Sequence, residues 1–388
     1  MISMLRHVDR WLFVQYRASA HDLAVARVVL AAFLLLLLPR GRWIADLPQA
    51  FYNPPLSLAV LTDDFASTPV LTALNVAAGA AALCLLLGYR TRFASMATTL
   101  ILITLNSLVF ATGKIDHGIL PVLAPAVMAW SGWGQAWSLD AALGRVRHLE
   151  PERAQRRWPL AWLALIVAIA MATAGLVKLH SGWLDPAESS SYGHALANAM
   201  LNERQTWLGG VMLRMQPNLI WELTDWATIV VETAGVLVVW RARWFRTWCV
   251  MLAALHLGVA LQMDIWFSSN IAAYAVFVPW AAVIAPLRRR LHAVGHVAPA
   301  LTGVVVALLT VRATLIWVFD TTPLIAVITP SIQRAIVLGA VPLALWAWIA
   351  SRRERHTNAT GQGESPDGSD RRASVRTGAV ARRSVRTQ

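Results

Sequence analysis

The chain has 388 residues, of which 57% are hydrophobic and only 14% are charged. Soluble domains carry about a quarter charged residues, so this composition excludes an ordinary water-soluble protein and predicts an all-α, polytopic integral membrane protein. The net charge of +13 comes from short basic clusters between apolar runs. These clusters form no DNA- or RNA-binding motif, and we expect no nucleic-acid partner. The two cysteines, Cys84 and Cys249, both lie within apolar runs, so we expect neither a disulfide nor a cysteine-based metal site.

About ten apolar runs follow one another along the chain. A helix crosses the hydrocarbon core with about 20 apolar residues. By that measure the predicted spans are 22–39, 69–88, 93–112, 118–131, 158–178, 218–240, 245–263, 265–287, 297–319 and 331–350. The fourth is short and contains Pro121 and Pro125, so we expect it to be broken or only partly inserted. The eighth has Ser268, Ser269 and Asn270 near its start, which is typical of a helix that faces other helices.

The distribution of basic residues predicts the orientation. With the N-terminus inside, most of the 34 Lys and Arg residues fall in inner segments, and every inner segment is basic. The positive-inside rule then places both termini on the cytoplasmic side. We expect a location in the inner (cytoplasmic) membrane of a bacterium.

The chain divides into a membrane domain, residues 1–350, and a tail, residues 351–388. The tail is rich in Arg, Ser, Thr and Gly and has no apolar periodicity, so it is predicted to be disordered. Its arginines either bind anionic headgroups or only fix the topology.

Two outer segments combine ionisable residues near span ends. Lys178 lies about 30 Å along the helix that begins at Trp158, at about 1.5 Å per residue, which is near the outer headgroup boundary. The orientation places Asp116 and His117 on the same side. All basic residues are Arg except Lys114 and Lys178, and only lysine can lose its proton and act as a base. The alternative is a lysine that merely extends to the headgroups.

Further ionisable residues lie deeper in the apolar runs. Glu232 and Asp225 fall in the sixth span, His256 in the seventh and Arg312 in the ninth. Such residues are costly in lipid and are expected to be paired or protonated. An internal ion pair that holds helices together explains Glu232 as well as a proton pathway does. The outer histidines and carboxylates show no metal-ligand spacing, so no metal site is predicted.

Four motifs, in order and spacing, resemble a known family. They are Phe51-Tyr52-Asn53-Pro54-Pro55; Leu87-Gly88-Tyr89-Arg90-Thr91-Arg92; Asp116-His117-Gly118 followed by Trp133 to Asp140; and Ala174-Gly175-Leu176-Val177-Lys178-Leu179 with Trp183. Residues from about 15 to 290 thereby resemble the HTTM domain, which vitamin K-dependent gamma-carboxylase shares with many bacterial proteins.

The resemblance implies roles for individual residues. Lys178 falls on the carboxylase's base, which deprotonates vitamin K hydroquinone, and His117 falls on a histidine assigned to carboxylation. Glu232 and His256 fall where the carboxylase has an acidic residue and a histidine. With Asp116 and Trp183 they are candidate substrate-binding residues, and the implied cofactor is a vitamin K- or menaquinone-like quinol.

The chain also departs from the carboxylase. Asp116 stands where the carboxylase has Asn, and Val177 replaces the first lysine of a Lys-Lys pair. Two predicted spans and a short tail follow in place of a large lumenal region that helps bind the protein substrate.

Three functions remain open. The leading hypothesis is an enzyme in which Lys178 takes a proton from a quinol-like lipid-soluble substrate, with His117 assisting at the outer face. The alternative is a non-catalytic protein that binds a lipid or quinone or scaffolds a partner complex. A third is transport, suggested by Glu232, His256 and Arg312, although no inverted repeat is evident. The first two differ in whether Lys178 and His117 line one cavity.

Overall fold

A computed structural model describes residues 2–37, 41–55, 57–113, 118–146, 158–187, 189–215, 219–285 and 323–361. Within these ranges the chain is helical and contains no β-strand. The chain forms two compact units, Met1–Ala347 and Trp348–Gln388. The candidate site lies entirely within the first.

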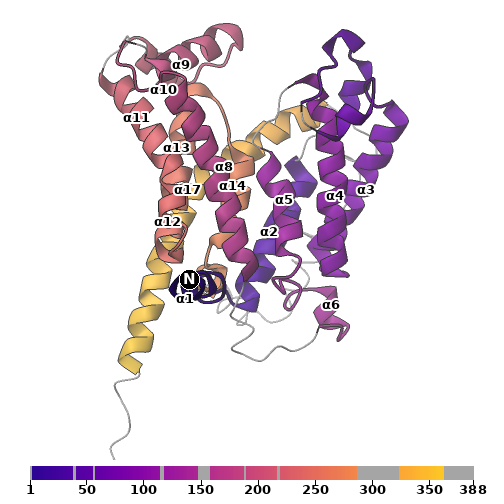
Figure 1. Ribbon diagram of the computed structural model, residues 1–388, viewed down its shortest axis with the longest axis vertical. Helices are drawn as coiled ribbons and strands as arrows, with labels where there is room; N and C mark the ends of the chain where they lie inside the picture. The colour runs from indigo at the N-terminus through magenta and orange to yellow at the C-terminus, as the bar shows by residue number, and fades with distance from the viewer. Residues whose placement is uncertain are drawn as a thin grey trace, which may run out of the picture. The chain divides into compact units, whose positions relative to one another are not determined.

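The helices follow one another in an order that matches the apolar runs (Figure 1). They are α1 (Ile2–Arg10), α2 (Ala20–Leu37), α3 (Thr68–Leu87), α4 (Thr91–Val109), α5 (Ile119–Met128), α6 (Leu139–Ala142), α8 (Trp158–His180), α9 (Ser190–Leu201), α10 (Trp207–Leu213), α11 (Leu219–Thr233), α12 (Gly235–Val238), α13 (Ala242–Met263), α14 (Ser268–Tyr274) and α17 (Pro323–Gly361). Short π or 3-10 turns lie at Trp11–Gln15, Gly41–Asp46, Gln49–Phe51, Leu58–Leu61, Phe110–Thr112 and Ala275–Phe277.

Six helical segments among the described residues are long and apolar enough to cross a membrane. They are Ala20–Asp46, Thr68–Leu87, Thr91–Thr112, Trp158–His180, Ala242–Met263 and Thr329–Ala350. These segments identify an integral membrane protein that contacts the lipid bilayer. The total of about ten spans and the cytoplasmic location of both termini stay predictions.

The remaining predicted spans differ from continuous helices. The fourth is the short helix α5, which has Pro125 inside it. The sixth is interrupted between α11 and α12, and the eighth begins with the short α14 and changes to a 3-10 turn at Ala275. The ninth, 297–319, lies outside the described residues. Helix α17 extends to Gly361, beyond the predicted start of the tail at residue 351, and the rest of the tail is not described.

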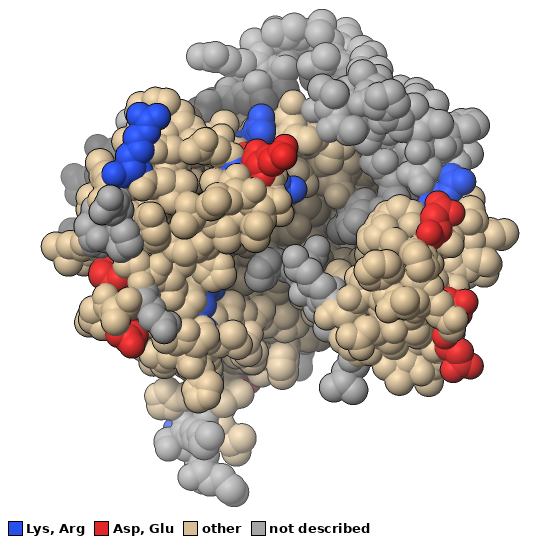
Figure 2. Space-filling model, turned by 90° about the horizontal axis from the view of Figure 1, so that it is seen from above, with Lys and Arg blue, Asp and Glu red and all other residues tan. Residues whose placement is uncertain are grey.

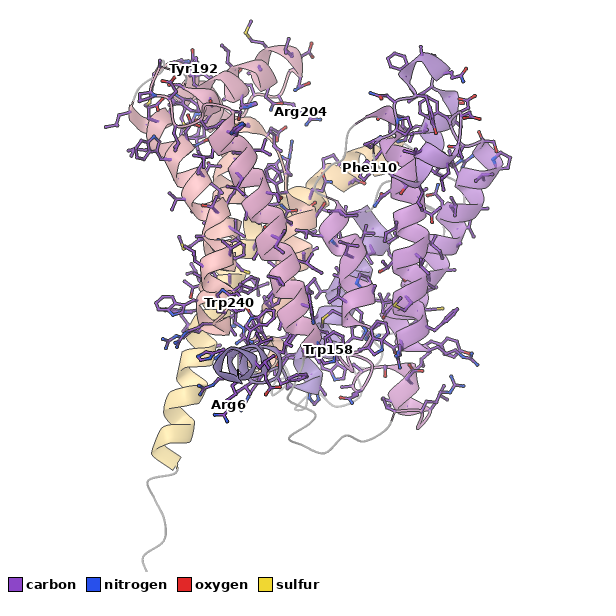
Figure 3. The ribbon with its side chains drawn as sticks, in the orientation of Figure 1. Arg6, Phe110, Trp158, Tyr192, Arg204 and Trp240 are labelled. Carbon is purple, nitrogen blue, oxygen red and sulfur yellow. The ribbon has the colours of Figure 1, made fainter. Side chains whose placement is uncertain are left out.

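The described helices of the first unit have their ends on two opposite sides. Arg6, Trp158 and Trp240 lie at one end of the helices, and Phe110, Tyr192 and Arg204 lie at the other (Figure 3). Seen from the end that carries α9 and α10, most of the described surface is uncharged (Figure 2). We call the α9 end the outer end, following the predicted orientation.

Two of the sequence motifs meet at the inner end. The buried Arg27 donates to the carbonyls of Leu85 and Leu86 at the end of α3, at 2.6 and 2.8 Å. Gly88 then turns the chain with a φ of +67°, and the Asp140 carboxylate accepts from the backbone N–H groups of Arg90 and Thr91 at 2.9 and 2.7 Å. The end of α3 and the start of α4 are therefore capped by side chains from distant segments.

The outer loop motif packs near the end of α4. The Tyr52 hydroxyl donates to the carbonyls of Ala59 and Thr62, at 2.5 and 2.8 Å. The Asn53 backbone N–H donates to the Ala111 carbonyl at 2.8 Å. This loop is thus held beside Gly113, immediately before the segment that contains Asp116 and His117.

Candidate functional site

Two helices approach closely at Gly175. This glycine of α8 is buried, and a Cβ atom there would lie 2.7 Å from Thr233 Cγ2 and 3.1 Å from Glu232 Cβ, both on α11. Only a residue without a side chain allows the backbones so near. The contact brings Glu232 beside Lys178, one helical turn farther along α8.

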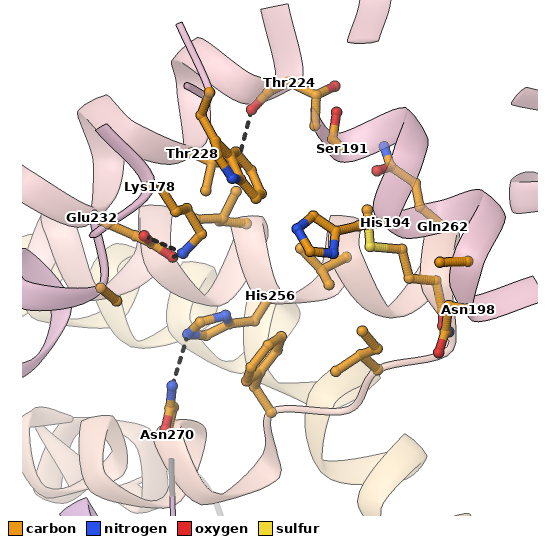
Figure 4. Close-up of a pocket in the computed structure, with 18 of the residues that line it drawn as sticks. Lys178, Ser191, His194, Asn198, Thr224, Thr228, Glu232, His256, Gln262 and Asn270 are labelled. Carbon is orange, nitrogen blue, oxygen red and sulfur yellow. Dashed lines mark hydrogen bonds and ion pairs between the residues drawn. The ribbon is translucent and has the colours of Figure 1, made fainter. Parts of the chain in front are cut away.

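Lys178 and Glu232 form an ion pair in which the ammonium group donates to both carboxylate oxygens (Figure 4). The Lys178 ammonium nitrogen lies 2.8 Å from Oε1 and 2.6 Å from Oε2 of Glu232. The two side chains are 23% and 9% exposed. The ammonium also lies 5.4 Å from the ring centre of Trp183, a cation–π arrangement. The lysine therefore binds a buried carboxylate.

His256 of α13 lies near this pair and is 4% exposed. Its Nε2 atom lies 3.1 Å from the Tyr274 hydroxyl and 3.3 Å from the Asn270 amide nitrogen. Its ring stacks on Tyr274 and lies 4.6 Å from the Phe267 ring. Because an amide N–H can only donate, Nε2 accepts from Asn270, which fixes the ring's orientation.

Helix α9 covers the outer side of these residues and is attached at both ends. At its start, the backbone N–H of Ser191 donates to Oδ1 of the fully buried Asp225 at 2.9 Å. Near its end, the Asn198 amide donates to the Met263 carbonyl at the end of α13. Just beyond α9, the Thr206 hydroxyl donates to the Leu261 carbonyl at 2.5 Å. These bonds connect the outer segment to α11 and α13.

A cavity of about 400 Å³ lies between α8, α9, α11, α13 and α14. Its volume is within the range of small-molecule sites, roughly 300–1,000 Å³. Its lining is mixed. The polar and aromatic side chains are Lys178, Trp183, Ser191, His194, Asn198, Asn202, Thr224, Thr228, Glu232, His256, Gln262, Phe267 and Asn270, and the aliphatic ones are Met171, Ala174, Ala197, Leu201, Leu255, Val259, Met263 and Ile265. This is a concave site that combines apolar walls with many polar side chains, which suits a small amphipathic molecule.

The comparison with family models identifies the chain. The HTTM domain model matches residues 16–281, which contain every described residue of the cavity. The chain belongs to the HTTM family. Comparison with curated proteins and with solved structures finds no significant match. The recognition made from the four motifs is therefore confirmed, and function has to be inferred from this HTTM protein's own site.

The structure brings together four of the predicted site residues. Lys178, Trp183, Glu232 and His256 all line the cavity. Asp116 and His117 lie outside the described residues, so their place near Lys178 stays a prediction. Among the described residues there is no group of three His, Cys, Asp or Glu side chains that could hold a metal ion.

Three polar residues of the cavity were not predicted as site residues. His194 is one of the outer histidines that were considered only as metal ligands, Asn270 was considered only as a helix-facing residue, and Gln262 was not considered. Gln262 is a long polar side chain in the last turn of α13, which follows an apolar stretch from Leu257 to Leu261, and this position in the sequence is a signal that could have identified it. Asn270 and Ser268 are 1% and 2% exposed, which confirms that the start of the eighth predicted span faces other helices.

Proposed function

We propose that this HTTM protein is a membrane enzyme that removes a proton from the hydroxyl group of a quinol-like, lipid-soluble molecule, with Lys178 as the base. The observation that carries the proposal is the Lys178–Glu232 pair on the wall of the cavity. A lysine that served only the headgroups would have no need of a buried carboxylate or of a cavity beside it.

The carboxylate gives the lysine a way to become a base. An ammonium group cannot accept a proton, but Glu232 lies within hydrogen-bonding distance and can take one from it. When an apolar ring displaces water from the cavity, separated charges lose hydration, which favours the neutral amine and carboxylic acid. The amine then accepts the hydroxyl proton, leaving an anionic quinolate beside the ammonium. Dioxygen can oxidise this quinolate.

The lining suits such a substrate. Aliphatic and aromatic side chains accommodate a ring, while Lys178, Glu232 and His256 present polar atoms to its hydroxyl groups. A vitamin K- or menaquinone-like molecule has such a ring and an isoprenoid tail that would continue into lipid. His117 is the second proposed catalytic group, on the resemblance to the carboxylase alone.

Substitution of Lys178 tests the proposal. The purified protein in lipid nanodiscs is mixed with a short-chain menaquinol, and its dioxygen-dependent oxidation is followed by absorbance. Lys178→Ala and Lys178→Arg should both abolish protein-dependent oxidation, because arginine keeps the charge but does not release its proton. Glu232→Gln should also abolish protein-dependent oxidation, because the amide cannot take the ammonium proton.

His180→Ala is the matched control, since His180 is an exposed basic residue two positions along the same helix. It should oxidise the quinol at the wild-type rate. Wild-type turnover by Lys178→Arg would refute the assignment of Lys178 as the base.

The non-catalytic alternative rests on the same ion pair, which also ties α8 to α11. It predicts saturable quinol binding by the wild type without oxidation above that of empty nanodiscs. In that case Lys178→Arg should retain both binding and stability, because arginine pairs with a carboxylate at least as well as lysine does.

A further inference from the structure

Helix α1 lies across the inner ends of the other helices. Figure 1 shows α1 nearly along its axis, whereas α8, α11 and α13 run up the page. Leu5 and Val8, three positions apart, share one face, and Leu5 is 62% exposed. Arg6 and Arg10, four positions apart, share another face and are both exposed. Separate apolar and basic faces at the end of a membrane bundle are typical of a helix that lies in the interface between lipid and water.

The segment after α1 is fixed to the start of α13. The Trp11 indole and the Tyr16 hydroxyl both donate to the Val239 carbonyl, at 3.0 and 2.6 Å. The Arg246 guanidinium of α13 donates to the Arg17 carbonyl at 3.2 Å. Two segments that are more than 200 residues apart in the sequence therefore form one continuous surface at the inner end.

Arginines from both segments gather on this surface. They are exposed, and we call them the arginine surface: Arg6, Arg10, Arg17, Arg241 and Arg243. None of the five pairs with a carboxylate in the part of the chain that the structure describes. The acidic residues between positions 2 and 22 are Asp9 and Asp22. Asp22 already accepts from the backbone N–H groups of Ser19 and Ala281, at 2.9 and 2.7 Å, so positive charge is in excess.

Apolar side chains border the arginines. Trp240 and Trp244 are each 52% exposed, and the Arg243 guanidinium lies 5.3 Å from the ring centre of Trp244. The Trp240 ring lies 5.3 Å from that of Trp11, so it belongs to the same surface. Exposed tryptophans at a helix end are typical of the level of the lipid headgroups. A soluble polyanion would match only the charge of this surface, whereas a phospholipid would match both its charge and its apolar border.

We infer that the arginine surface binds the headgroup of an anionic phospholipid, whose acyl chains lie against Leu5 and Trp240. Guanidinium groups form paired hydrogen bonds with phosphate oxygens. Each arginine near an anionic lipid surface contributes about fivefold in affinity. The alternative, in which these arginines only fix the orientation of the chain, predicts no preference among lipids. The inference does not depend on the chemistry proposed for the cavity.

Native mass spectrometry tests the inference. The full chain in detergent micelles is titrated with phosphatidylglycerol or phosphatidylcholine of the same acyl chains, and the Kd of the first bound lipid is measured. The wild type should bind phosphatidylglycerol at least about twenty-five-fold more tightly than phosphatidylcholine. Arg6→Gln combined with Arg10→Gln should lower this ratio about twenty-five-fold, which is two factors of about five.

Matched variants separate the arginine surface from charge in general. Arg90→Gln combined with Arg92→Gln removes the same charge from exposed positions between α3 and α4, and should leave the ratio unchanged. Arg241→Gln combined with Arg243→Gln should lower the ratio as the α1 pair does. The arginines of the tail are present in every variant. An unchanged Kd for phosphatidylcholine shows that a variant remains folded.

Three results would overturn the inference. They are equal affinity of the wild type for the two lipids, an unchanged ratio in the α1 double variant, and an equal fall in the Arg90 and Arg92 control. Glycerol 1-phosphate at the same concentration as the lipid should not displace it, because it has no acyl chains. Displacement would identify a site for soluble phosphate esters and would also contradict the proposal.

Discussion

Replacing Gly175 with alanine tests whether the close contact between α8 and α11 sets the geometry of the ion pair. The new methyl group would lie 2.7 Å from Thr233 Cγ2 and 3.1 Å from Glu232 Cβ. Carbon atoms pack best at about 3.5–4.0 Å, so α11 has to move away from α8. Such overpacking costs about 1–3 kcal/mol, and the movement lengthens the Lys178–Glu232 contact.

Gly258 provides the reference, because it is also a helical glycine and a Cβ there would meet nothing within 4 Å. Alanine improves helix propensity by about 1 kcal/mol at either position, so this gain cancels between the two variants. Gly175→Ala should therefore be less stable than Gly258→Ala by about 1–3 kcal/mol. The free energies of unfolding can be compared by SDS titration in mixed micelles, followed by circular dichroism.

A second substitution identifies the atoms responsible. Thr233→Ser removes the Cγ2 methyl group nearest to the new alanine and leaves the hydroxyl that bonds to the Ile229 carbonyl at 2.7 Å. Gly175→Ala combined with Thr233→Ser should recover most of the lost stability and quinol oxidation. Equal stability of Gly175→Ala and Gly258→Ala would refute the close contact between α8 and α11 at Gly175. If the double variant did not regain stability, the Thr233 methyl group would not be the atom responsible for the loss.

Three further variants test other parts of the fold by the same unfolding assay or by hydrogen exchange. Gly88→Ala should destabilise by more than 1 kcal/mol, because φ is +67° there and a Cβ would lie 2.3 Å from Ser138 Cβ and 2.6 Å from Arg27 Nη1; wild-type stability would contradict the close packing of Gly88 against Ser138 and Arg27. For Asp140, burial raises the carboxyl pKa, but hydrogen bonds from Thr91 and Arg90 and the charge of Arg145 lower it below its ordinary value overall. The advantage of wild type over Asp140→Asn should thus be about 1 kcal/mol at pH 7 and should vanish as the pH falls through the lowered pKa; a pH-independent difference would exclude the ionised carboxylate as the cause. Asp225→Ala should speed amide exchange in Ser190–Leu201 by about fivefold or more, given a lost bond of about 1 kcal/mol, whereas Asp225→Asn, which keeps an acceptor, should change it less.

Hydropathy predicted the long spans well and the interrupted ones poorly. The predicted 69–88 and 158–178 correspond to Thr68–Leu87 and Trp158–His180. The predicted 218–240 is broken near Gly235, where a Cβ would lie 2.5 Å from Trp248 and 3.2 Å from the Ala168 backbone. Average hydropathy measures transfer to lipid, and it contains no information about such close contacts between helices.

The members of the site could be predicted singly but not as a set. Lys178 was singled out because it is one of only two lysines among the basic residues, and Glu232 was expected to be paired or protonated. Lys178 and Glu232 are 54 residues apart in the sequence, and their ion pair depends on how α8 and α11 are oriented where they pack together at Gly175. The sequence pattern does not determine that orientation. Gln262 and Asn270 also line the cavity, and their convergence on it exists only in the folded structure.

The choice of lysine at position 178 bears on which function the pair serves. If the pair only tied α8 to α11, arginine would do so with two parallel hydrogen bonds and would hold its charge more firmly. Elsewhere the chain uses arginine for every basic position except Lys114. What arginine cannot do is release its proton to Glu232 and then accept one from a ligand. A lysine here, paired to a buried carboxylate on the wall of a cavity, is what proton removal from a hydroxyl would need. Lys178→Arg therefore separates the two functions, since it should preserve the ion pair between α8 and α11 and abolish quinol oxidation.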